Sequence, residues 1–286
     1  MTPRELLKKT AADFRAAGIP DPEVDASLLL SHVTGLAPLM LRLDADRVLT
    51  ESELTQFDAL CRKRLERVPL QYMLGTQDFM GHTFHVDERV LIPRPETELL
   101  CERAIDAAKL AAGDHPRVLD LCCGSGCLCT SIALALPHAQ VHGADLSTDA
   151  LAVSQMNAAS LGADVTLHQG DLFGAVQGMQ FDVIVSNPPY IPSAECLVLQ
   201  EEVRQEPLMA LDGGESGLDF YKRIAKDAPD HLTHGGVLLL EVGWDQGESV
   251  RQLLDEAGFT ATAVHQDYNG IGRMVEGHRH GGSHEL

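Results

Sequence analysis

The feature that most constrains the fold is a repeated alternation of short apolar runs and helical segments between residues 96 and 276. Such alternation is typical of βαβ units, whose strands pair in parallel and carry helices on both faces of the sheet. We therefore predict an α/β domain with a doubly wound sheet. Ligands of these sheets bind at the carboxyl ends of the strands, beside the point where the strand order reverses. The predicted strands are 118–121, 141–145, 165–169, 181–185, 236–242 and 260–265.

The first 75 residues carry helical signals and almost no strand signals. Thr2 with Glu5, and Thr50 with Glu53, have the spacing of capping boxes at helix N-termini. The helix after Thr50 has an apolar face at three- and four-residue steps, formed by Leu54, Phe57, Cys61, Leu65 and Val68. We predict a small α-helical bundle and interpret it as a substrate-recognition domain.

Apolar and polar residues alternate between residues 76 and 95, which predicts a β-hairpin linking the helical domain to the α/β domain. The expected organisation is thus a helical domain over 1–75, a hairpin linker over 76–95 and an α/β domain over 96–276. We expect residues 277–286 to form a disordered tail.

The first predicted strand of the α/β domain ends in a turn of small residues that precedes a helix. Glycines in such a turn let a ligand approach the backbone and the N–H groups of the helix N-terminus. Pyrophosphate cofactors usually require GxGxxG, but this turn reads GSGCLC, which weakens a dinucleotide interpretation. A small-residue turn that merely closes a βα unit is the alternative. The turn consists of Cys122, Cys123, Gly124, Ser125 and Gly126.

Carboxylates follow the next two strands. Asp145 has the spacing from the glycines at which a carboxylate accepts hydrogen bonds from ribose, although it is also placed to cap a helix. Asp171 and Leu172 follow the third strand, where an adenine would be held. These strand ends favour a nucleoside that needs no phosphate contacts, and S-adenosyl-L-methionine meets that description.

The end of the α/β domain supports the same ligand. A turn at 268–270 and a further short run at 272–275 would form an antiparallel hairpin with 260–265. This hairpin distinguishes the seven-stranded, Rossmann-like sheet of class I S-adenosylmethionine-dependent methyltransferases from the nicotinamide-binding sheet.

The fourth predicted strand ends abruptly in VSNPPYIP, residues 185–192. Pro188 and Pro189 lack backbone donors and fix φ, so they end strand pairing and stiffen the loop. An amide or amino nitrogen is a poor nucleophile because its lone pair is delocalised. The side-chain oxygen of Asn187 and the backbone carbonyl of Pro188 would each accept one of its N–H groups, and Tyr190 offers a flat face. The pattern favours methylation of a planar nitrogen; the alternative is a turn that only terminates a strand.

Composition limits the other functions. Lys and Arg number 22 against 42 Asp and Glu, and the resulting charge of -20 argues against unaided nucleic-acid binding, although an acidic surface also simply maintains solubility. Seven cysteines without an export signal should be thiols. Four of them lie in one short turn, whereas zinc sites combine pairs from distant segments, so we expect no metal. No apolar run is long enough to span a membrane, which predicts a cytoplasmic protein.

Three stretches carry a resemblance to a known family. The chain resembles the HemK/PrmC-type glutamine N5-methyltransferases in VSNPPYIP, in QYMLGTQDFMGHTFHVDERVLIPRPETELL (71–100) and in EEVRQEPLMALDGGESGLDFYKRI (201–224). The resemblance runs over about residues 6–275. NPPY alone is shared with adenine-N6 DNA methyltransferases and some ribosomal RNA methyltransferases, but LIPRPETE together with NPPY is much narrower.

The resemblance implies an enzyme, which we expect to be a monomer, that transfers a methyl group from S-adenosyl-L-methionine to glutamine N5 in the Gly-Gly-Gln motif of peptide chain release factors. It implies that Asn187, Pro188, Pro189 and Tyr190 bind the substrate glutamine, with Asn187, Pro188 and Tyr190 catalytic. The implied cofactor-binding residues are Cys122, Cys123, Gly124, Ser125, Gly126, Asp145, Asp171, Leu172 and Asn187.

Two positions depart from the family pattern, and both concern cofactor affinity. Cys122 replaces a glycine of the usual GTGSG turn, and Leu172 replaces a frequent aromatic residue. A positive φ at Cys122 would cost about 1 kcal/mol. Arg94, Glu96 and Glu98, within LIPRPETE, either belong to the site or fix the hairpin against the sheet.

Two rival functions stay open at this point. An NPPY-type nucleic-acid methyltransferase, acting on ribosomal RNA or DNA, shares the motif, but the DNA-directed members need a base-reading module and usually a basic surface. A binding protein without activity would result if the altered glycine turn had lost the cofactor.

Overall fold

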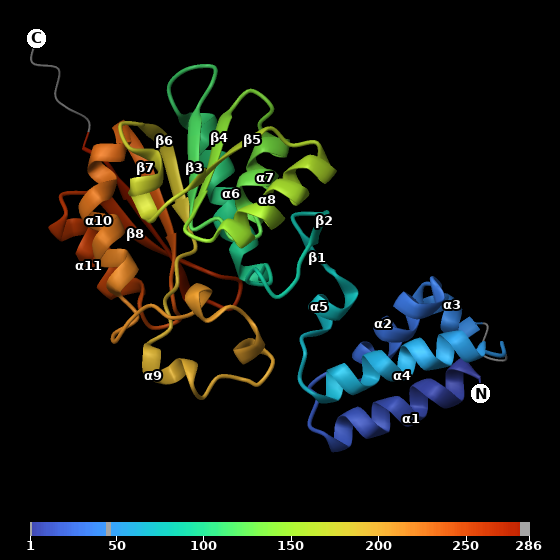
Figure 1. Cartoon of the computed structure of the whole chain (residues 1–286). Helices are drawn as coiled ribbons and strands as arrows, with labels where there is room; N and C mark the ends of the chain where they lie inside the picture. The colour runs from blue at the N-terminus through green and yellow to red at the C-terminus, as the bar shows by residue number, and fades with distance from the viewer. Residues whose placement is uncertain (1, 44–46, 281–286) are drawn as a thin grey trace, which may run out of the picture. The chain divides into compact units, whose positions relative to one another are not determined.

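The computed structural model describes residues 2–43 and 47–280, and the chain forms two compact units (Figure 1). The smaller unit comprises Met1–Gly75 and Gln200–Gln205, and the larger comprises Thr76–Leu199 and Glu206–Leu286. The hairpin that we predicted as a linker thus belongs to the larger unit. A short segment far along the chain, 200–205, belongs to the smaller one.

The smaller unit is helical, as predicted. Both capping boxes are confirmed: Thr2 with Glu5 caps α1, and Thr50 with Glu53 caps α4, each side chain accepting the other residue's backbone N–H. The elements are α1 (Pro3–Ala16), α2 (Pro22–Thr34), α3 (Pro38–Leu43), α4 (Glu51–Leu65), α5 (Leu70–Leu74) and the 3₁₀ turn η2 (Val203–Gln205).

The apolar face predicted for α4 is wrong at its C-terminal end. Phe57 is fully buried, but Leu65 is 43% exposed, whereas the neighbouring Arg64 is only 4% exposed. Arg64 Nε donates to Asp25 Oδ2 at 2.7 Å, and its Nη1 donates to Glu202 Oε1 at 2.9 Å. A guanidinium can lie inside a protein when carboxylates compensate its charge and accept its hydrogen bonds, and here that compensation outweighs the apolar periodicity.

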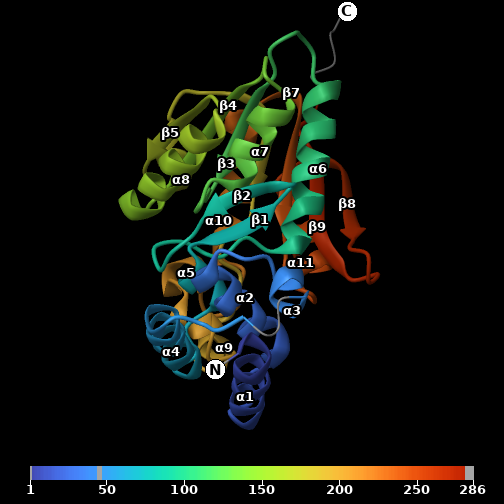
Figure 2. The same cartoon turned by 90° about the vertical axis from the view of Figure 1, so that its right-hand side faces the viewer.

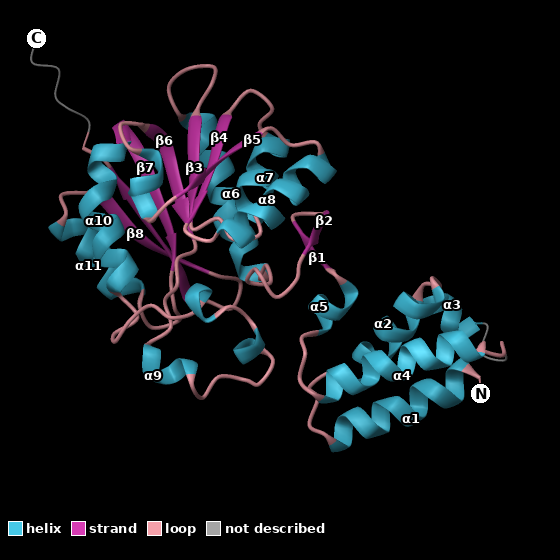
Figure 3. Ribbon diagram, in the orientation of Figure 1, coloured by secondary structure: helices cyan, strands magenta, loops and turns pink. Residues whose placement is uncertain are grey.

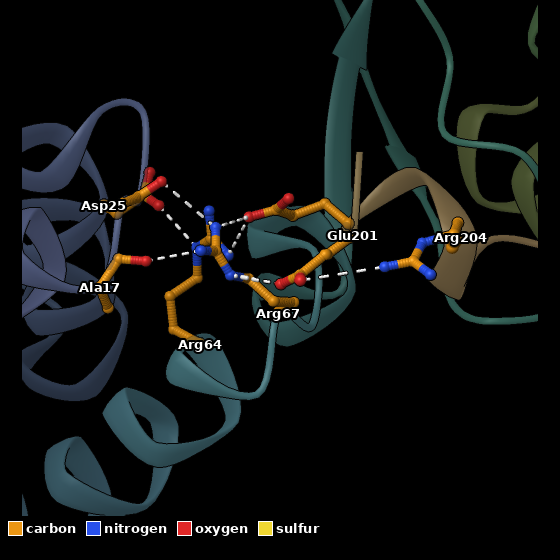
Figure 4. Close-up of polar contacts among 8 residues, drawn as sticks. Ala17, Asp25, Arg64, Arg67, Glu201 and Arg204 are labelled. Carbon is orange, nitrogen blue, oxygen red and sulfur yellow. Dashed lines mark hydrogen bonds and ion pairs between the residues drawn. The ribbon is translucent and has the colours of Figure 1, made fainter. Parts of the chain in front are cut away.

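A second arginine holds the same segment. Arg67 Nε lies 2.8 Å from Glu201 Oε2, and its Nη1 lies 3.2 Å from Glu202 Oε1. Its Nη2 donates to the carbonyl of Ala17 at 2.5 Å. Figure 4 shows these contacts converging between α1, α2 and the 200–205 segment. Arg64 and Arg67 therefore fasten this segment to the helices of the smaller unit.

We expect Arg64→Ala to destabilise the helical unit by about 3 kcal/mol, because it leaves the buried Asp25 carboxylate without its counter-charge and removes one of the two arginine partners of Glu202. The measurement is hydrogen exchange of the amides in α1, α2 and α4. The control is Arg15→Ala, whose ion pair with Glu23 has both side chains 60% exposed and should change the opening free energy by less than about 0.5 kcal/mol. Equal effects of the two variants would contradict this account of Arg64.

The larger unit contains a hairpin and a seven-stranded sheet. Its sheet has the order β5-β4-β3-β6-β7-β9-β8, in which only β9 runs antiparallel to its neighbours. The predicted strands and the terminal antiparallel hairpin are thus confirmed. The strands are β1 (Thr76–Phe79), β2 (His82–His85), β3 (Arg117–Leu121), β4 (Gln140–Asp145), β5 (Val165–Gln169), β6 (Phe181–Ser186), β7 (Leu232–Glu241), β8 (Thr260–Gln266) and β9 (Gly272–His278).

The helices of the larger unit cover both faces of its sheet (Figures 2 and 3). Those that pack on the two faces are α6 (Pro95–Leu110), α7 (Cys127–Ala135), α8 (Thr148–Leu161), α10 (Asp219–His231) and α11 (Gly247–Glu256). The unit also contains the short helix α9 (Ser193–Cys196) and the 3₁₀ turns η1 (Leu172–Val176) and η3 (Leu208–Ala210). Successive strand residues enter different cores because side chains alternate across a strand. Val183 and Val185 pack with α6 and α7, whereas Ile184 packs with α10 and α11. Burial on both faces explains why these strands read as continuous apolar runs.

The hairpin is anchored inside the larger unit by two polar side chains. Glu98 of α6 accepts the backbone N–H of Met80 at 2.7 Å, so Glu98 fixes the hairpin, one of the two roles left open for it. Asn157 of α8 accepts the N–H of His85 at 2.7 Å and donates to the carbonyl of Ser125 at 2.9 Å. The hairpin is thereby tied to the glycine turn.

The C-terminal strand extends further than predicted. Gly277 and His278 belong to β9, although we placed the start of a disordered tail at residue 277. Residues 281–286 of that tail lie outside the described residues. Within the described part of the chain, no helix has the length and hydropathy needed to cross a membrane.

Candidate functional site

The candidate site lies where the strand order reverses, between β3 and β6. The glycine turn follows β3, and NPPY follows β6, so both leave the sheet at the same edge. Ser186, the last residue of β6, donates its hydroxyl hydrogen to the carbonyl of Leu121, the last residue of β3, at 2.5 Å. This buried hydrogen bond sets the distance between the two loops.

A cavity of about 560 Å³ opens at this edge. Among the predicted site residues, Gly126, Pro188 and Tyr190 are not part of its lining. The predicted residues that do line it are Cys122, Cys123, Gly124, Ser125, Asp145, Asp171, Leu172, Asn187 and Pro189. Tertiary structure thus brings together nine residues from four segments of the chain.

Left-handed backbone conformations shape the side of the cavity formed by the glycine turn and the residues after β5. Gly124 and Gly126 have φ of 53° and 75°, and a Cβ on Gly126 would overlap the Ser154 side chain. Cys122 has φ of 65° and Leu172 has φ of 48°. The two positions that depart from the family pattern therefore both adopt a conformation that costs a non-glycine residue about 1 kcal/mol.

The cavity is lined by carboxylates more than by cations. Asp145, Asp171, Asp212 and Asp219 contribute to the lining, against the single guanidinium of Arg89 among the described residues. Arg89 is itself paired with Asp87 at 2.8 Å. Such a lining disfavours a pyrophosphate and suits a cationic ligand such as a sulfonium.

Asp145 holds the turn as well as lining the cavity. Its carboxylate accepts the backbone N–H of Gly124 and of Ser147, each at 2.9 Å, and burial raises the pKa of Asp145 above its usual value. Asp120 lies deeper, fully buried, and accepts the N–H of Cys129 in the first turn of α7. Burial raises the pKa of Asp120 to about 7. Of these two carboxylates, only Asp145 therefore reaches the cavity.

All seven cysteines are free thiols; Cys61 and Cys122 are partly buried and the other five are buried. Burial raises the pKa of Cys122 and of Cys127, which makes both unreactive. No group of three or more His, Cys, Asp or Glu side chains among the described residues is arranged to hold a metal ion.

The NPPY turn is supported by a glycine-rich segment that the pattern analysis did not use. Ile191 donates to the carbonyl of Leu211 at 2.9 Å, and Gly213 donates to the carbonyl of Ile191 at 2.8 Å. A Cβ on Gly213 would lie 2.7 Å from Tyr190 Cα and 2.8 Å from the Pro189 carbonyl oxygen. Only glycine lets the two backbones approach this closely. Tyr190 is partly buried and packs against the core beside α10, and burial raises its pKa to about 12.

Another wall of the cavity comes from the residues that follow the smaller unit's 200–205 segment. Buried Glu206 accepts the backbone N–H of Ile92 at 2.9 Å and pairs with Arg94. Arg94 thus fixes a cavity wall, since residues 207–210 come directly after Glu206 and line the cavity. The sequence pattern could not predict that residues 207–210 line the cavity, because the contacts that place them join residues more than 100 positions apart.

Thr97 of α6 is the main polar residue that pattern reasoning missed. It lines the cavity, accepts a hydrogen bond from Asn187 Nδ2 at 3.3 Å and donates one to Glu241 Oε2 at 2.7 Å. Thr97 lies within LIPRPETE, so the stretch that carried the resemblance contained it. Its partner Glu241 ends β7 and reads only as the end of an apolar run.

A seven-stranded sheet with one antiparallel strand, carrying a glycine turn and an acidic cavity at its switch point, defines a class I S-adenosylmethionine-dependent methyltransferase. Residues 5–75 match the family model of the PrmC N-terminal domain, and residues 97–269 match that of the methyltransferase small domain. The chain belongs to the release factor glutamine methyltransferase family.

Individual relatives support this membership. The chain is 47% identical over 279 residues to the release factor glutamine methyltransferase of Chlorobaculum tepidum, with 94% of each chain covered. It is 44% identical over 277 residues to that of Geobacter sulfurreducens, with 96% of each covered. A methyltransferase structure from Pyrococcus furiosus, 17% identical, shares the fold with a TM-score of 0.53 over 76% of this chain and 98% of that one.

We expect Gly213→Ala to lower the rate of methyl transfer about 10- to 100-fold, because the added Cβ must push the NPPY backbone out of position. Gly174→Ala is the control, since a Cβ there meets no atom within 4 Å. Rates are compared at saturating S-adenosylmethionine. If Gly213→Ala were as active as Gly174→Ala, the close packing would have no bearing on the site.

Proposed function

We propose that the chain transfers a methyl group from S-adenosylmethionine to the side-chain N5 of the glutamine in the Gly-Gly-Gln motif of peptide chain release factors. The observation that carries this proposal is the position of Asn187. It directly follows β6 and lines the cavity, next to the glycine turn, and its Nδ2 donates a hydrogen bond to Thr97. Its Oδ1 is thereby directed to accept a hydrogen bond from a substrate amide.

The reaction requires an unreactive amide nitrogen to attack a carbon. Asn187 Oδ1 and the Pro188 carbonyl would each accept one N–H of the glutamine amide, draw the nitrogen out of conjugation and aim its lone pair. The two prolines and the contact with Gly213 keep these acceptors fixed, so little reorganisation is needed as the reaction proceeds. Tyr190 would bound the amide from one side and steady the turn through its core packing.

The cofactor side fits S-adenosylmethionine, which supplies an electrophilic methyl group when bound. The glycine turn would hold the amino-acid part, with Gly126 allowing the close approach of α8 behind it. Asp145 would accept hydrogen bonds from the ribose hydroxyls, and Asp171 with Leu172 would border the adenine. Excess carboxylate around the cavity stabilises a sulfonium.

The helical unit forms a module separate from the methyltransferase unit. We assign it the recognition of the body of the release factor. We propose that the enzyme acts as a monomer in the cytoplasm and needs no nucleic acid. A charge of -20 accords with a protein substrate better than with a phosphate backbone.

The proposed substrate can be tested by incubating the enzyme with labelled cofactor and either purified release factors or ribosomal RNA, and then mapping the modified residue by mass spectrometry. Labelling of RNA alone would overturn the proposal.

We expect Asn187→Ala to lower methyl transfer at least 100-fold, because one of the two acceptors for the amide is lost. Affinity for S-adenosylmethionine, measured by calorimetry, should change by less than about threefold, since the turn and Asp145 stay intact. Asn269→Ala, in the exposed turn between β8 and β9, is the control and should retain activity. Full turnover by Asn187→Ala would sink the assignment of the NPPY turn.

A further inference from the structure

A buried acid lies behind Asn187, the residue that follows β6. Glu241 is 5% exposed and closes β7, the strand next to β6. Its Oε2 accepts a hydrogen bond from the Thr97 hydroxyl, with an oxygen–oxygen distance of 2.7 Å. Thr97 Oγ1 in turn accepts a hydrogen bond from Asn187 Nδ2 at 3.3 Å. Three side chains from β7, α6 and the NPPY turn thus form one chain of hydrogen bonds that ends at the cavity.

The direction of these bonds follows from the number of protons available. A threonine hydroxyl carries a single hydrogen, and an ionised carboxylate carries none. Because the hydrogen of Thr97 goes to Glu241, its oxygen is left only as an acceptor. The side chain of Asn187 must therefore turn its NH₂ toward Thr97 and its Oδ1 away from it.

We propose that Glu241 and Thr97 are positioning residues that fix the amide orientation of Asn187, so that Oδ1 rather than Nδ2 meets the N–H of the substrate amide. This inference rests on the proposed function for its catalytic consequence. Its structural consequence, a single orientation of the Asn187 amide, does not depend on any substrate. If the Asn187 amide were flipped, its NH₂ would face the N–H of the substrate amide, and the acceptor Oδ1 would no longer be available to the substrate.

The chain is fixed at its buried end. The Tyr221 hydroxyl of α10 donates to the backbone carbonyl of Glu241 at 2.8 Å. This bond holds the main chain of Glu241 without touching its carboxylate. Tyr221 therefore provides a matched control: its removal disturbs the same residue but leaves the hydrogen-bond chain complete.

The proton state of Glu241 decides the orientation. Burial raises the pKa of Glu241 to about 7; the bond from Thr97 and the charges of Arg273 and Arg94 oppose this rise, and Glu96 adds to it. A protonated Glu241 would donate to Thr97, freeing the Thr97 hydrogen for Asn187 Oδ1 and reversing the chain. Other titratable groups around Glu241 are Tyr190, Tyr221, His265 and Asp267.

The kinetic test uses the full-length enzyme with a purified release factor. We expect Thr97→Val to lower kcat about 10-fold or more with little change in KM for S-adenosylmethionine, and Thr97→Ser to restore activity to within about threefold. In the wild type, kcat should fall as the pH drops below about 7. Glu241→Gln should lower kcat and abolish this acidic limb, because glutamine has no proton to gain. Tyr221→Phe should retain both kcat and the limb.

The second test needs no turnover. The Asn187 side-chain NH₂ resonances of ¹⁵N-labelled protein, assigned by their loss in Asn187→Ala, should shift with a midpoint near pH 7 in the wild type and stay constant in Glu241→Gln. Constant wild-type resonances would overturn the inference, as would Thr97→Val that raises KM for S-adenosylmethionine at unchanged kcat. A wild type that titrates but methylates no release factor would instead refute the proposed function and support the orientation of Asn187.

Discussion

The parallel pairing of β3 with β6 is the interaction on which the rest of the site depends. Leu121 and Ser186 are 65 positions apart in the chain, yet they are register partners and share a buried hydrogen bond. The pairing brings the glycine turn and Asn187 to one edge of the sheet. A slip of one residue in this pairing would move each side chain of β6 to the opposite face of the sheet. Since the residues on the two faces pack into different cores, their burial strongly favours the observed register.

The NPPY turn is held by other segments of the chain, because Pro188 and Pro189 have no backbone N–H to donate. Gly213 approaches the NPPY backbone directly, and Gln246 donates to the Tyr190 carbonyl at 2.9 Å. Behind Asn187, Thr97 and Glu241 add a polar support inside the protein. Placing a carboxylate there costs desolvation, and the hydrogen bond from Thr97 offsets part of that cost. Stability is thus given up locally to hold one amide in one orientation.

Pattern reasoning identified the strands, the capping boxes and the glycine turn because each depends on residues close in sequence. It failed at Leu65, where the periodicity of α4 predicts a buried side chain and the buried residue is Arg64. The reason is a pair of carboxylates, Asp25 and Glu202, brought from α2 and from a segment far along the chain. Tyr190 shows the same limit: it is partly buried and packs against the core, while Asn187 and Pro189 line the cavity.

Four features could be derived from the amino-acid sequence alone: the α/β class, the N-terminal helical unit, the terminal antiparallel hairpin and the NPPY turn. Local propensities, turn chemistry and apolar periodicity encode these features within a few residues. Only the tertiary structure decided that Thr97 and Glu241 stand behind Asn187, and that Asp145 reaches the cavity while Asp120 lies buried beneath α7. These relations arise from strand order and helix packing, which bring together side chains that no local pattern connects.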